Sequence, residues 1–323
     1  MQKVRVGVVG VGHLGQHHAR VYTELPNCEL VGVVDIDRKQ AEKLARMHKT
    51  TAYTDFRDLI GKVDACSVVV PTIHHHEIGR VLLDAGIHLL VEKPICTTVD
   101  EAHDLIQIAR RTGAILQVGH IERFNAAIMR LREVASAPAF IEAHRLGPYD
   151  PRIKDIGVVL DLMIHDLDII LNLVNSPVVH VEAAGVGVYG EKEDIANARI
   201  HFASGCIANV TASRITPTRK RKIRVFQKDA YLSIDYIEQE LEIFQRVRIP
   251  NAQPGMPNVS IVRRKEKMER REPLKVELAH FLEVVTRGGE PLVKGEHARD
   301  ALALAVEISE LVKKRLGDFA GLM

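Results

Sequence analysis

Three groups of residues in this sequence have types and spacings that could support chemistry, and the first is a glycine-rich turn. Gly10-Val11-Gly12-His13-Leu14-Gly15 is a GxGxxG motif that directly follows a β-branched run. In such a motif the first glycine permits a tight turn, the second lets the backbone approach a pyrophosphate, and the third lets a helix pack closely on the strand. The amides that open this helix favour bound phosphate. The motif therefore predicts a dinucleotide site.

An acidic residue after the next apolar run indicates which dinucleotide is bound. Asp35 follows Glu29–Val34 and stands twenty residues after Gly15. A carboxylate at this position holds both ribose hydroxyls and repels the 2′-phosphate of NADP. Arg38 is close enough in the chain to weaken that preference by pairing with a phosphate. We expect NAD as the cofactor, with NADP the less favoured alternative.

The other two groups of residues could take part in proton transfer. Glu92-Lys93-Pro94 follows an apolar run, where a lysine could bind a substrate hydroxyl and join in its proton transfer. Asp161 and His165 are four residues apart, on one face of an expected helix. Such a pair could orient an imidazole that accepts a hydroxyl proton while hydride leaves the same carbon. The alternative is that both are solvated polar residues of a helix that carries two further aspartates.

Neither the histidines nor the cysteines predict a metal site. His74, His75 and His76 are adjacent, so their side chains point in different directions, and no cysteine or carboxylate cluster accompanies them. The four cysteines lie far apart without a CxxC pair, as expected of core residues in a reducing compartment. No run approaches the roughly 20 apolar residues of a membrane span, and no charged segment precedes a long apolar one. We therefore expect a cytoplasmic protein with no membrane partner.

The elements that must position these residues alternate in the first part of the chain. Short apolar runs are separated by helical patterns, which predicts βαβ units and a parallel sheet. The expected strands are 3–9, 29–34, 65–70, 88–91 and 115–118, and the expected helices are 13–25, 38–47, 76–85 and 99–111.

After about residue 121 the rhythm changes to several strand-like runs with little helix between them. This predicts a second domain of α+β type with a mostly antiparallel sheet. We place the boundary so that residues 1–121 form the dinucleotide-binding domain and residues 122–323 the second domain, where we expect the substrate to bind. The expected strands are 178–188, 196–202, 207–213, 223–227, 231–235 and 240–247, and the expected helices are 126–136, 159–174, 274–287 and 297–315.

Composition excludes several classes of protein. The 323 residues are 46% hydrophobic and 27% charged, which excludes disorder as the main state. The formal net charge is +2, which argues against a dedicated nucleic-acid or membrane-surface protein. Two basic clusters, residues 219–222 and 263–271, stand out. We interpret them as solvated loops or a subunit edge, with a phosphate or acidic-partner patch as the alternative.

Taken together, the GxGxxG motif, Glu92-Lys93-Pro94 and the Asp161/His165 pair resemble the Gfo/Idh/MocA family of oxidoreductases, and the resemblance runs the length of the chain. It implies a Rossmann domain joined to a domain whose open sheet mediates oligomerisation, so a homodimer or homotetramer is expected. It also implies NAD(P)-dependent oxidation or reduction of a carbinol. The alternatives within it are a dehydrogenase of another sugar or of inositol, and a cofactor-sensing regulator without turnover.

The resemblance implies roles for individual residues. Lys93 matches the family's catalytic lysine, His165 its proton-accepting histidine and Asp161 the acidic residue that accompanies them. Around the cofactor it implies Gly10, Gly12, His13, Leu14, Gly15 and Asp35 at the pyrophosphate and adenosine ribose, and Pro71, Thr72, His75 and Glu92 at the nicotinamide side. Val70-Pro71-Thr72 departs from the commoner Thr-Pro-Asn, and Leu162-Met163-Ile164 lacks the usual glycines.

Two stretches, residues 120–125 and 161–168, are most similar to the subgroup that acts on UDP-linked N-acetylglucosamine. These enzymes oxidise the 3-hydroxyl to a ketone, a step before amination in the synthesis of 2,3-diamino-sugar lipid A. The similarity implies a substrate side lined by His120, Arg123, Asn125, Arg145 and Tyr149. A diphosphate would also give the basic residues a ligand.

Overall fold

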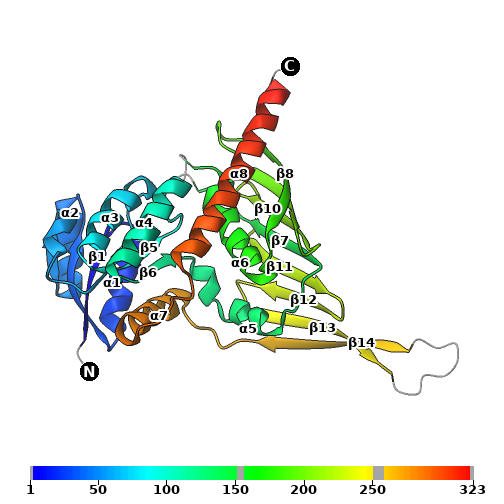
Figure 1. Cartoon of the computed structure of the whole chain (residues 1–323), viewed down its shortest axis with the longest axis horizontal. Helices are drawn as coiled ribbons and strands as arrows, with labels where there is room; N and C mark the ends of the chain where they lie inside the picture. The colour runs from blue at the N-terminus through cyan, green and yellow to red at the C-terminus, as the bar shows by residue number, and fades with distance from the viewer. Residues whose placement is uncertain (1–2, 151–155, 250–257, 321–323) are drawn as a thin grey trace. The chain divides into compact units, whose positions relative to one another are not determined.

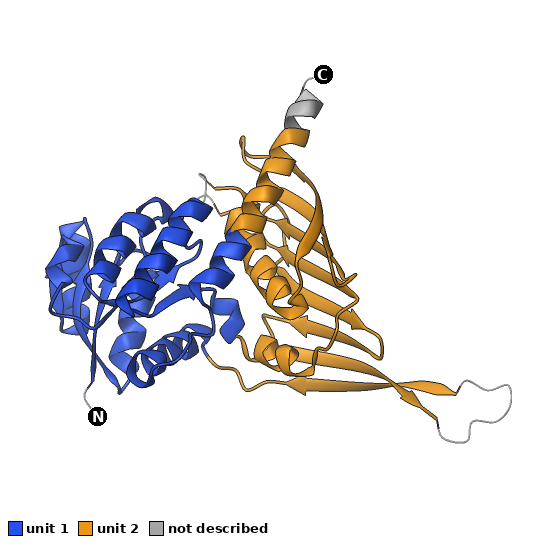
Figure 2. Ribbon diagram, in the orientation of Figure 1, with its two compact units in different colours: residues 1–124, 272–302 blue, residues 125–271, 303–323 orange. Residues whose placement is uncertain are grey.

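The computed structural model describes residues 3–150, 156–249 and 258–320. The chain divides into two compact units (Figure 2): unit 1 consists of residues 1–124 and 272–302, and unit 2 of residues 125–271 and 303–323. The first break lies three residues beyond the expected domain boundary. The return of residues 272–302 to unit 1 was not expected from the sequence.

Unit 1 is built on a parallel sheet of six strands in the order β3-β2-β1-β4-β5-β6. The order reverses between β1 and β4, and in open α/β sheets the ligand binds at the carboxyl ends of the strands beside such a reversal. The strands are β1 Val4–Val9, β2 Cys28–Val34, β3 Thr51–Tyr53, β4 Ala65–Val68, β5 His88–Glu92 and β6 Leu116–Gly119.

Helices cover this sheet (Figure 1) because each carries an apolar face. They are α1 Gly15–Glu24, α2 Arg38–His48, α3 His75–Asp84, α4 Val99–Thr112 and α7 Pro273–Arg287, with short 3₁₀ turns η1 Phe56–Leu59, η2 Thr72–His74 and η3 Ile121–Phe124. Leu278, Phe281 and Leu282 of α7 join the buried cluster of β1 and β2. That shared core explains why residues 272–302 belong to unit 1.

Unit 2 is built on a sheet of eight strands in the order β14-β13-β12-β11-β7-β10-β9-β8. Every described pair of neighbours is antiparallel except β7 and β10, which are parallel. The strands are β7 Phe140–Leu146, β8 Val178–Val186, β9 Ile195–Phe202, β10 Ile207–Ser213, β11 Lys220–Gln227, β12 Ala230–Asp235, β13 Glu240–Arg248 and β14 Val259–Lys267. The expected fold class, a Rossmann unit followed by a mostly antiparallel sheet, is confirmed.

One face of this sheet is packed against helices, as the burial pattern requires. Ile141 and Ala143 of β7 alternate with partly exposed residues, so one face is buried and the other open. Helices α5 and α6 contact β12, β7 and β10 (Figure 1). The helical elements of unit 2 are α5 Ala126–Val134, η4 Val159–Met163, α6 Ile164–Val174 and the part of α8 Gly295–Ala320 that follows Leu302. Across the described ranges every helix is too short or too polar to span a lipid bilayer.

Candidate active site

The glycine-rich turn has the form that a dinucleotide needs. Gly10 has a φ of 85°, in the left-handed region that favours glycine. A Cβ at Gly15 would lie 1.8 Å from the Gly10 carbonyl oxygen, so only glycine lets α1 begin this close to β1. A Cβ at Gly12 would meet nothing within 4 Å, so that side of the turn is open to a ligand. His13 and Leu14 are exposed beside it.

The Asp35 carboxylate at the end of β2 is held in one orientation by two hydrogen bonds. One carboxylate oxygen accepts a hydrogen bond from the Val11 amide and the other from the Asp37 amide, each at 3.0 Å. Gln40, which the sequence did not single out, donates to the Val11 carbonyl at 2.8 Å and so ties α2 to the glycine-rich turn. Arg38 is exposed at the start of α2. The geometry fits the adenosine half of NAD, because the carboxylate is fixed where a ribose would approach.

The segment after β4 contains Pro71, Thr72 and His75, which were expected at the nicotinamide side. His75 is 1% exposed, and its ring nitrogens lie 2.9 Å from the carbonyl oxygens of Val70 and Pro94. Burial lowers the pKa of this imidazole, which keeps the ring uncharged. His75 therefore ties β4 to the segment that carries Lys93, and its expected place beside nicotinamide stays a prediction. Pro71 and Thr72 open η2 at the carboxyl edge of the sheet.

Glu92 is turned inward from the end of β5. Its carboxylate accepts hydrogen bonds from His18 Nε2 and from the Lys93 amide, each at 3.2 Å. A Cβ at Gly119 would lie 2.9 Å from the Glu92 Cδ, so β6 needs glycine there to make room. Glu92 thus accepts a hydrogen bond from the backbone amide of Lys93, and its expected contact with the nicotinamide ribose stays a prediction.

Behind Glu92, hydrogen bonds continue through three more side chains. His18 Nδ1 lies 3.1 Å from Ser67 Oγ, which lies 2.8 Å from the Tyr22 hydroxyl. Burial alone would raise the pKa of Glu92, but the hydrogen bond from His18 and the charges of His18 and Lys93 hold that pKa below its ordinary value. We call Tyr22, Ser67, His18 and Glu92 the α1–β5 network. This network therefore ends at the ionised carboxylate of Glu92, which accepts a hydrogen bond from the Lys93 amide.

Glu277 of α7 is a second buried carboxyl group that the sequence did not predict. It is fully buried, and neither of its carboxyl oxygens has a hydrogen-bond partner among the described residues. Burial first, and then the negative charge of Glu92, raises the pKa of Glu277 well above its ordinary value. Glu277 is therefore an uncharged acid beside an ionised one. The sequence around Glu277 has the pattern of an amphipathic helix and did not indicate that this side chain is buried.

In unit 2, Asp161 and His165 lie on one continuous helical segment. Asp161 is in η4, a π-helical turn of the kind often found at functional sites, and His165 is in the first turn of α6. Between them Met163 and Ile164 are fully buried, while Asp161 and His165 are partly exposed. Glu193 accepts a hydrogen bond from the Val159 amide at 3.3 Å, which holds the start of the turn. The segment presents a carboxylate and an imidazole to solvent from a rigid base.

The five residues expected on the substrate side divide into two groups. His120, Arg123 and Asn125 are at most 3% exposed. Arg123 donates to the Leu292 carbonyl at 3.4 Å, and Asn125 accepts from the Ala127 amide and donates to the Tyr236 carbonyl. The Arg123 and Asn125 side chains therefore hold the protein's own backbone, and the expected role of His120, Arg123 and Asn125 at the substrate stays a prediction.

Arg145 and Tyr149 have other surroundings. Arg145 forms two hydrogen bonds with Asp166, at 2.7 and 3.1 Å, and lines a cavity in unit 2. The Tyr149 ring packs on Tyr189 with centroids 4.2 Å apart, and the Arg214 guanidinium lies over it at 5.8 Å.

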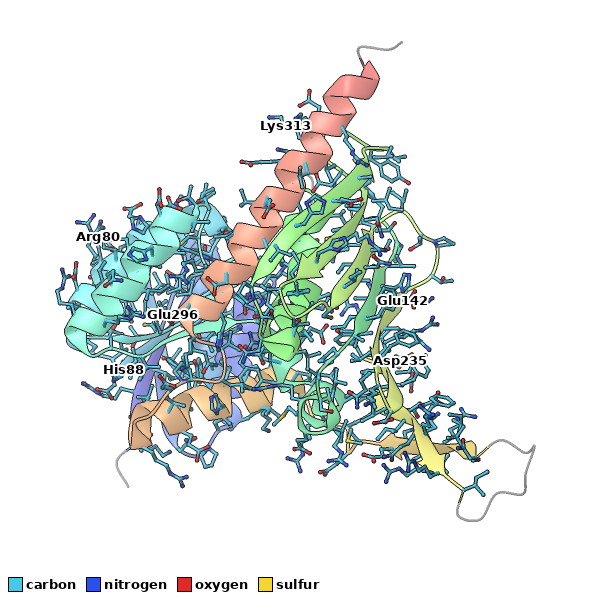
Figure 3. All side chains as sticks on the ribbon, turned by 45° about the vertical axis from the view of Figure 1, so that its right-hand side comes forward. Arg80, His88, Glu142, Asp235, Glu296 and Lys313 are labelled. Atoms are coloured by element: carbon cyan, nitrogen blue, oxygen red, sulfur yellow. The ribbon has the colours of Figure 1, made fainter. Side chains whose placement is uncertain are left out.

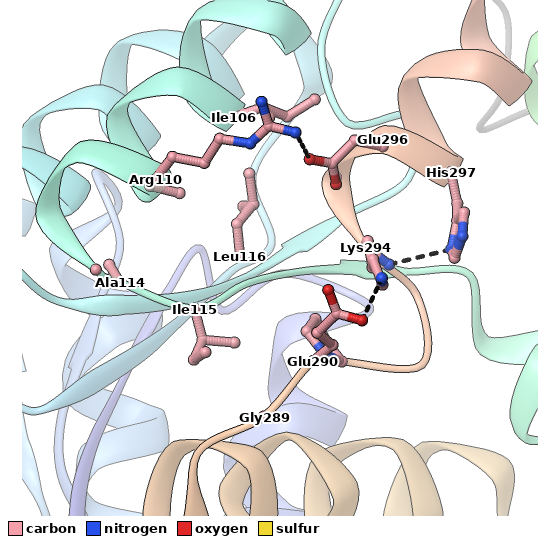
Figure 4. Close-up of a pocket in the computed structure, with 14 residues that line it drawn as sticks. Ile106, Arg110, Ala114, Ile115, Leu116, Gly289, Glu290, Lys294, Glu296 and His297 are labelled. Carbon is pink, nitrogen blue, oxygen red and sulfur yellow. Dashed lines mark hydrogen bonds and ion pairs between the residues drawn. The ribbon is translucent and has the colours of Figure 1, made fainter.

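A larger pocket lies away from these residues. It has a volume of about 520 Å³ and is lined by the amino-terminal part of β6, the end of α4 and residues 289–297 (Figure 4). Ion pairs Arg110–Glu296 and Lys294–Glu290 cross it. None of the site residues expected from the sequence lines it, so we do not assign the chemistry to it. No three histidine, cysteine, aspartate or glutamate side chains gather as metal ligands within the described ranges.

Comparison with known proteins identifies the family. Residues 4–120 match the model of the Gfo/Idh/MocA oxidoreductase family with an NAD-binding Rossmann fold, and residues 117–233 match a Gfo/Idh/MocA C-terminal domain. The chain is 36% identical to the UDP-N-acetylglucosamine 3-dehydrogenase of Acidithiobacillus ferrooxidans over 97% of this chain and 98% of that protein. A solved structure of that enzyme has a TM-score of 0.89 and 35% identity, over 97% of this chain and 99% of that one.

More distant similarity extends to inositol enzymes. The NAD-dependent scyllo-inositol 2-dehydrogenase of Bacillus subtilis is 29% identical over 67% of this chain and 68% of its own length. The motifs, the fold and these matches agree with one another. The chain belongs to the Gfo/Idh/MocA family of oxidoreductases, NAD-binding enzymes with a Rossmann fold.

Proposed function

We propose that this enzyme oxidises the 3-hydroxyl of UDP-N-acetylglucosamine to a ketone with NAD. The observation that carries the proposal is the 36% identity, over 97% of the chain, to a dehydrogenase of that substrate. The inositol dehydrogenase of Bacillus subtilis matches at 29% over only 67% of the chain. The product, a 3-keto nucleotide sugar, suits a subsequent amination, as in the synthesis of diamino-sugar lipid A.

Lys93, His165 and Asp161 have separate roles in the proposed reaction. Oxidation of the alcohol removes a hydride from carbon and a proton from oxygen, and bound NAD supplies the hydride acceptor. In the proposal Lys93 donates a hydrogen bond to the reacting hydroxyl, and His165 accepts its proton. Asp161, one helical turn before His165, orients the imidazole and favours its charged form once the proton has arrived. The α1–β5 network fixes the backbone that carries Lys93.

The cofactor cradle supports NAD as the partner of this chemistry. Gly12 leaves room for the pyrophosphate and Asp35 is fixed for the ribose, where its charge disfavours a 2′-phosphate. The four cysteines are buried and free, in keeping with the reducing cytoplasm where we place the enzyme.

The test is a substrate panel read by NADH absorbance. Purified enzyme is offered NAD or NADP with UDP-N-acetylglucosamine, free N-acetylglucosamine, UDP-glucose, or scyllo- and myo-inositol. We expect NADH only with UDP-N-acetylglucosamine and NAD. Turnover of an inositol or a free sugar instead would assign the enzyme to another branch of the family. Cofactor binding without turnover of any substrate would favour a regulator.

We also propose that the open face of the eight-stranded sheet joins two copies of the chain. Aromatic rings run across that face from β7 to β13, with neighbouring centroids 4.8 to 5.5 Å apart; they are Phe140, Phe226, Tyr231 and Phe244. A partly exposed aromatic row is typical of an interface. Light scattering should give a dimer or tetramer that Phe226→Asp dissociates, whereas a wild-type monomer would overturn the proposal.

A further inference from the structure

Three arginines lie at the same end of three adjacent strands in unit 2. Arg145 is on β7, Arg221 is on β11 and Arg214 directly follows β10, and these strands are neighbours in the order β11-β7-β10. Strand alternation puts Arg221 on the face of buried Ile223 and Val225, which is also the face of Arg145. The three cations therefore lie on the helix-covered face of the sheet, at one end of its central strands.

These arginines line a cavity of about 140 Å³ together with Arg219, Asp150 and Asp161. The lining therefore contains four guanidinium groups and two carboxylates, and two further carboxylates, Asp166 and Asp194, pair with Arg145 and Arg214. Pockets for a whole ligand usually measure about 300–1,000 Å³. The cavity is therefore large enough for one charged group of a ligand and too small for a complete nucleotide sugar.

Two of the arginines are fixed in place by buried carboxylates. Asp166 accepts two hydrogen bonds from Arg145 and a third from the Tyr236 hydroxyl at 2.9 Å. Asp194 accepts from Arg214 at 2.6 Å and from two backbone amides of the 188–189 turn. Guanidinium groups held in this way keep one orientation, which is how a protein prepares a site for an anion.

The register of the sheet brings Arg145 and Arg221 together at the cavity. These two residues are directly opposite each other in β7 and β11, and Arg145 is also paired with Asp166. On the other face of β11, Lys222 pairs with Asp235 and Arg224 with Glu142, both at 3.3 Å (Figure 3 labels the two acids). Within β11, Arg221 is therefore the cation that lines the cavity.

We propose that this cavity binds the diphosphate of the nucleotide-sugar substrate, with Arg219 and Arg221 as the residues that recognise it. The inference rests on the proposed function and gives two residues of the 219–222 cluster, Arg219 and Arg221, a role. Asp161 lines the cavity and lies about one helical turn, roughly 5.4 Å of helix axis, from His165. A diphosphate held there places the attached sugar ring beside the imidazole. The free sugar lacks this anchor.

The test compares Arg219→Ala and Arg221→Ala with Lys220→Ala, a cation on the same strand as Arg221 that points to the opposite face. Calorimetry measures the affinity for UDP and for inorganic pyrophosphate, and steady-state kinetics measure KM and kcat. We expect each arginine variant to weaken UDP binding and raise the KM for the nucleotide sugar at least tenfold, with kcat within twofold of wild type. Lys220→Ala should leave all values within twofold, and Arg221→Lys should recover part of the affinity.

Unchanged UDP affinity in both arginine variants would overturn the diphosphate site even if the enzyme turned the sugar over. Conversely, UDP or pyrophosphate binding that depends on Arg221, without any turnover of UDP-N-acetylglucosamine, would support the site and reject the proposed substrate. Circular dichroism shows whether each variant is folded.

Discussion

At the scale of single residues, Glu92 and Glu277 have opposite ionisation states for a physical reason. The Glu92 side chain is 14% exposed and has a hydrogen bond from His18, whereas Glu277 is fully buried and its carboxyl group has no hydrogen-bond partner among the described residues. The first carboxyl therefore has a lowered pKa and the second a raised one. Neither state was predictable from the sequence, because burial and partners are set by how α7 packs in the folded unit.

The raised pKa of Glu277 predicts how stability changes with pH. Above the ordinary value of 4.5 the unfolded chain loses this proton while the folded chain keeps it, so stability falls as pH rises. The contribution is about 1.4 kcal/mol per pH unit until the folded pKa is reached. Glu277→Gln removes this slope, and we expect the variant to be more stable than wild type at neutral pH. The difference should vanish in acid.

Urea denaturation across the pH range measures this difference. Glu283→Gln, on the exposed side of the same helix, is the matched control and should follow the wild-type curve. If Glu277→Gln proved less stable than wild type at neutral pH, the buried acid would have to be ionised or paired.

The acid–base residues make a second prediction at this scale. Lys93→Met and His165→Asn should each lower kcat at least a hundredfold, since general acid–base catalysis contributes about 10²–10⁴-fold. NAD binding should remain, because the cradle around residues 10–15 is unchanged. The chain has no tryptophan, so calorimetry is the suitable measurement of NAD affinity. Full turnover in both variants would refute their assignment.

At the scale of elements, the motif-bearing strands and helices were predictable and the exceptions have identifiable causes. Strand β7 was not predicted, because Arg145 places a charged residue at a buried position of the alternating pattern. Strand β14 was not predicted because most of its residues are exposed and its sequence resembles that of a basic loop. Its arginines and lysines pair with acids of β13, such as Arg263 with Glu242 and Lys265 with Glu240. The 263–271 cluster thus has largely local partners.

The glycine-rich turn allows a matched test of an element. Gly15→Ala places a methyl group against the Gly10 carbonyl, and forcing such a contact costs typically about 1–3 kcal/mol. Gly12→Ala meets nothing in the protein, so its stability should stay within about 1 kcal/mol of wild type while NAD affinity falls, because the methyl group occupies the approach of the pyrophosphate. Urea denaturation and calorimetry separate the two effects. Equal NAD affinity in wild type and Gly12→Ala would contradict the cradle.

The α1–β5 network joins a helix to two strands. The His18→Ala variant measures what this network contributes to stability and to catalysis. The variant leaves Glu92 buried without its side-chain partner, a loss of about 1–3 kcal/mol. Since the pKa of Glu92 is lowered in the fold, this stabilisation is present above its ordinary value of 4.5 and is lost as pH falls through the folded value. The kcat should fall with an altered pH profile while the KM for NAD stays constant. An unchanged pH profile would assign His18 to stability alone.

At the scale of the whole molecule, α8 is common to both units. Its residues up to Leu302 belong to unit 1 and those from Ala303 to unit 2, within one uninterrupted helix. Helix formation is cooperative, so melting on one side of this boundary removes support from the other. We therefore expect one cooperative thermal transition, although the NAD residues belong to unit 1 and the diphosphate cavity to unit 2. A ligand of either unit should then stabilise the whole chain.

Calorimetric scans of the enzyme alone, with NAD and with UDP test this coupling. At a ligand concentration a hundred times its Kd, each ligand should add about 2.7 kcal/mol of stability to the single transition. Leu302→Pro should divide that transition into two, because proline in a helix interior costs about 3 kcal/mol or more and interrupts the shared segment. After the division NAD should shift only one transition and UDP only the other. Two independent transitions in the wild-type enzyme would show that α8 does not couple the units.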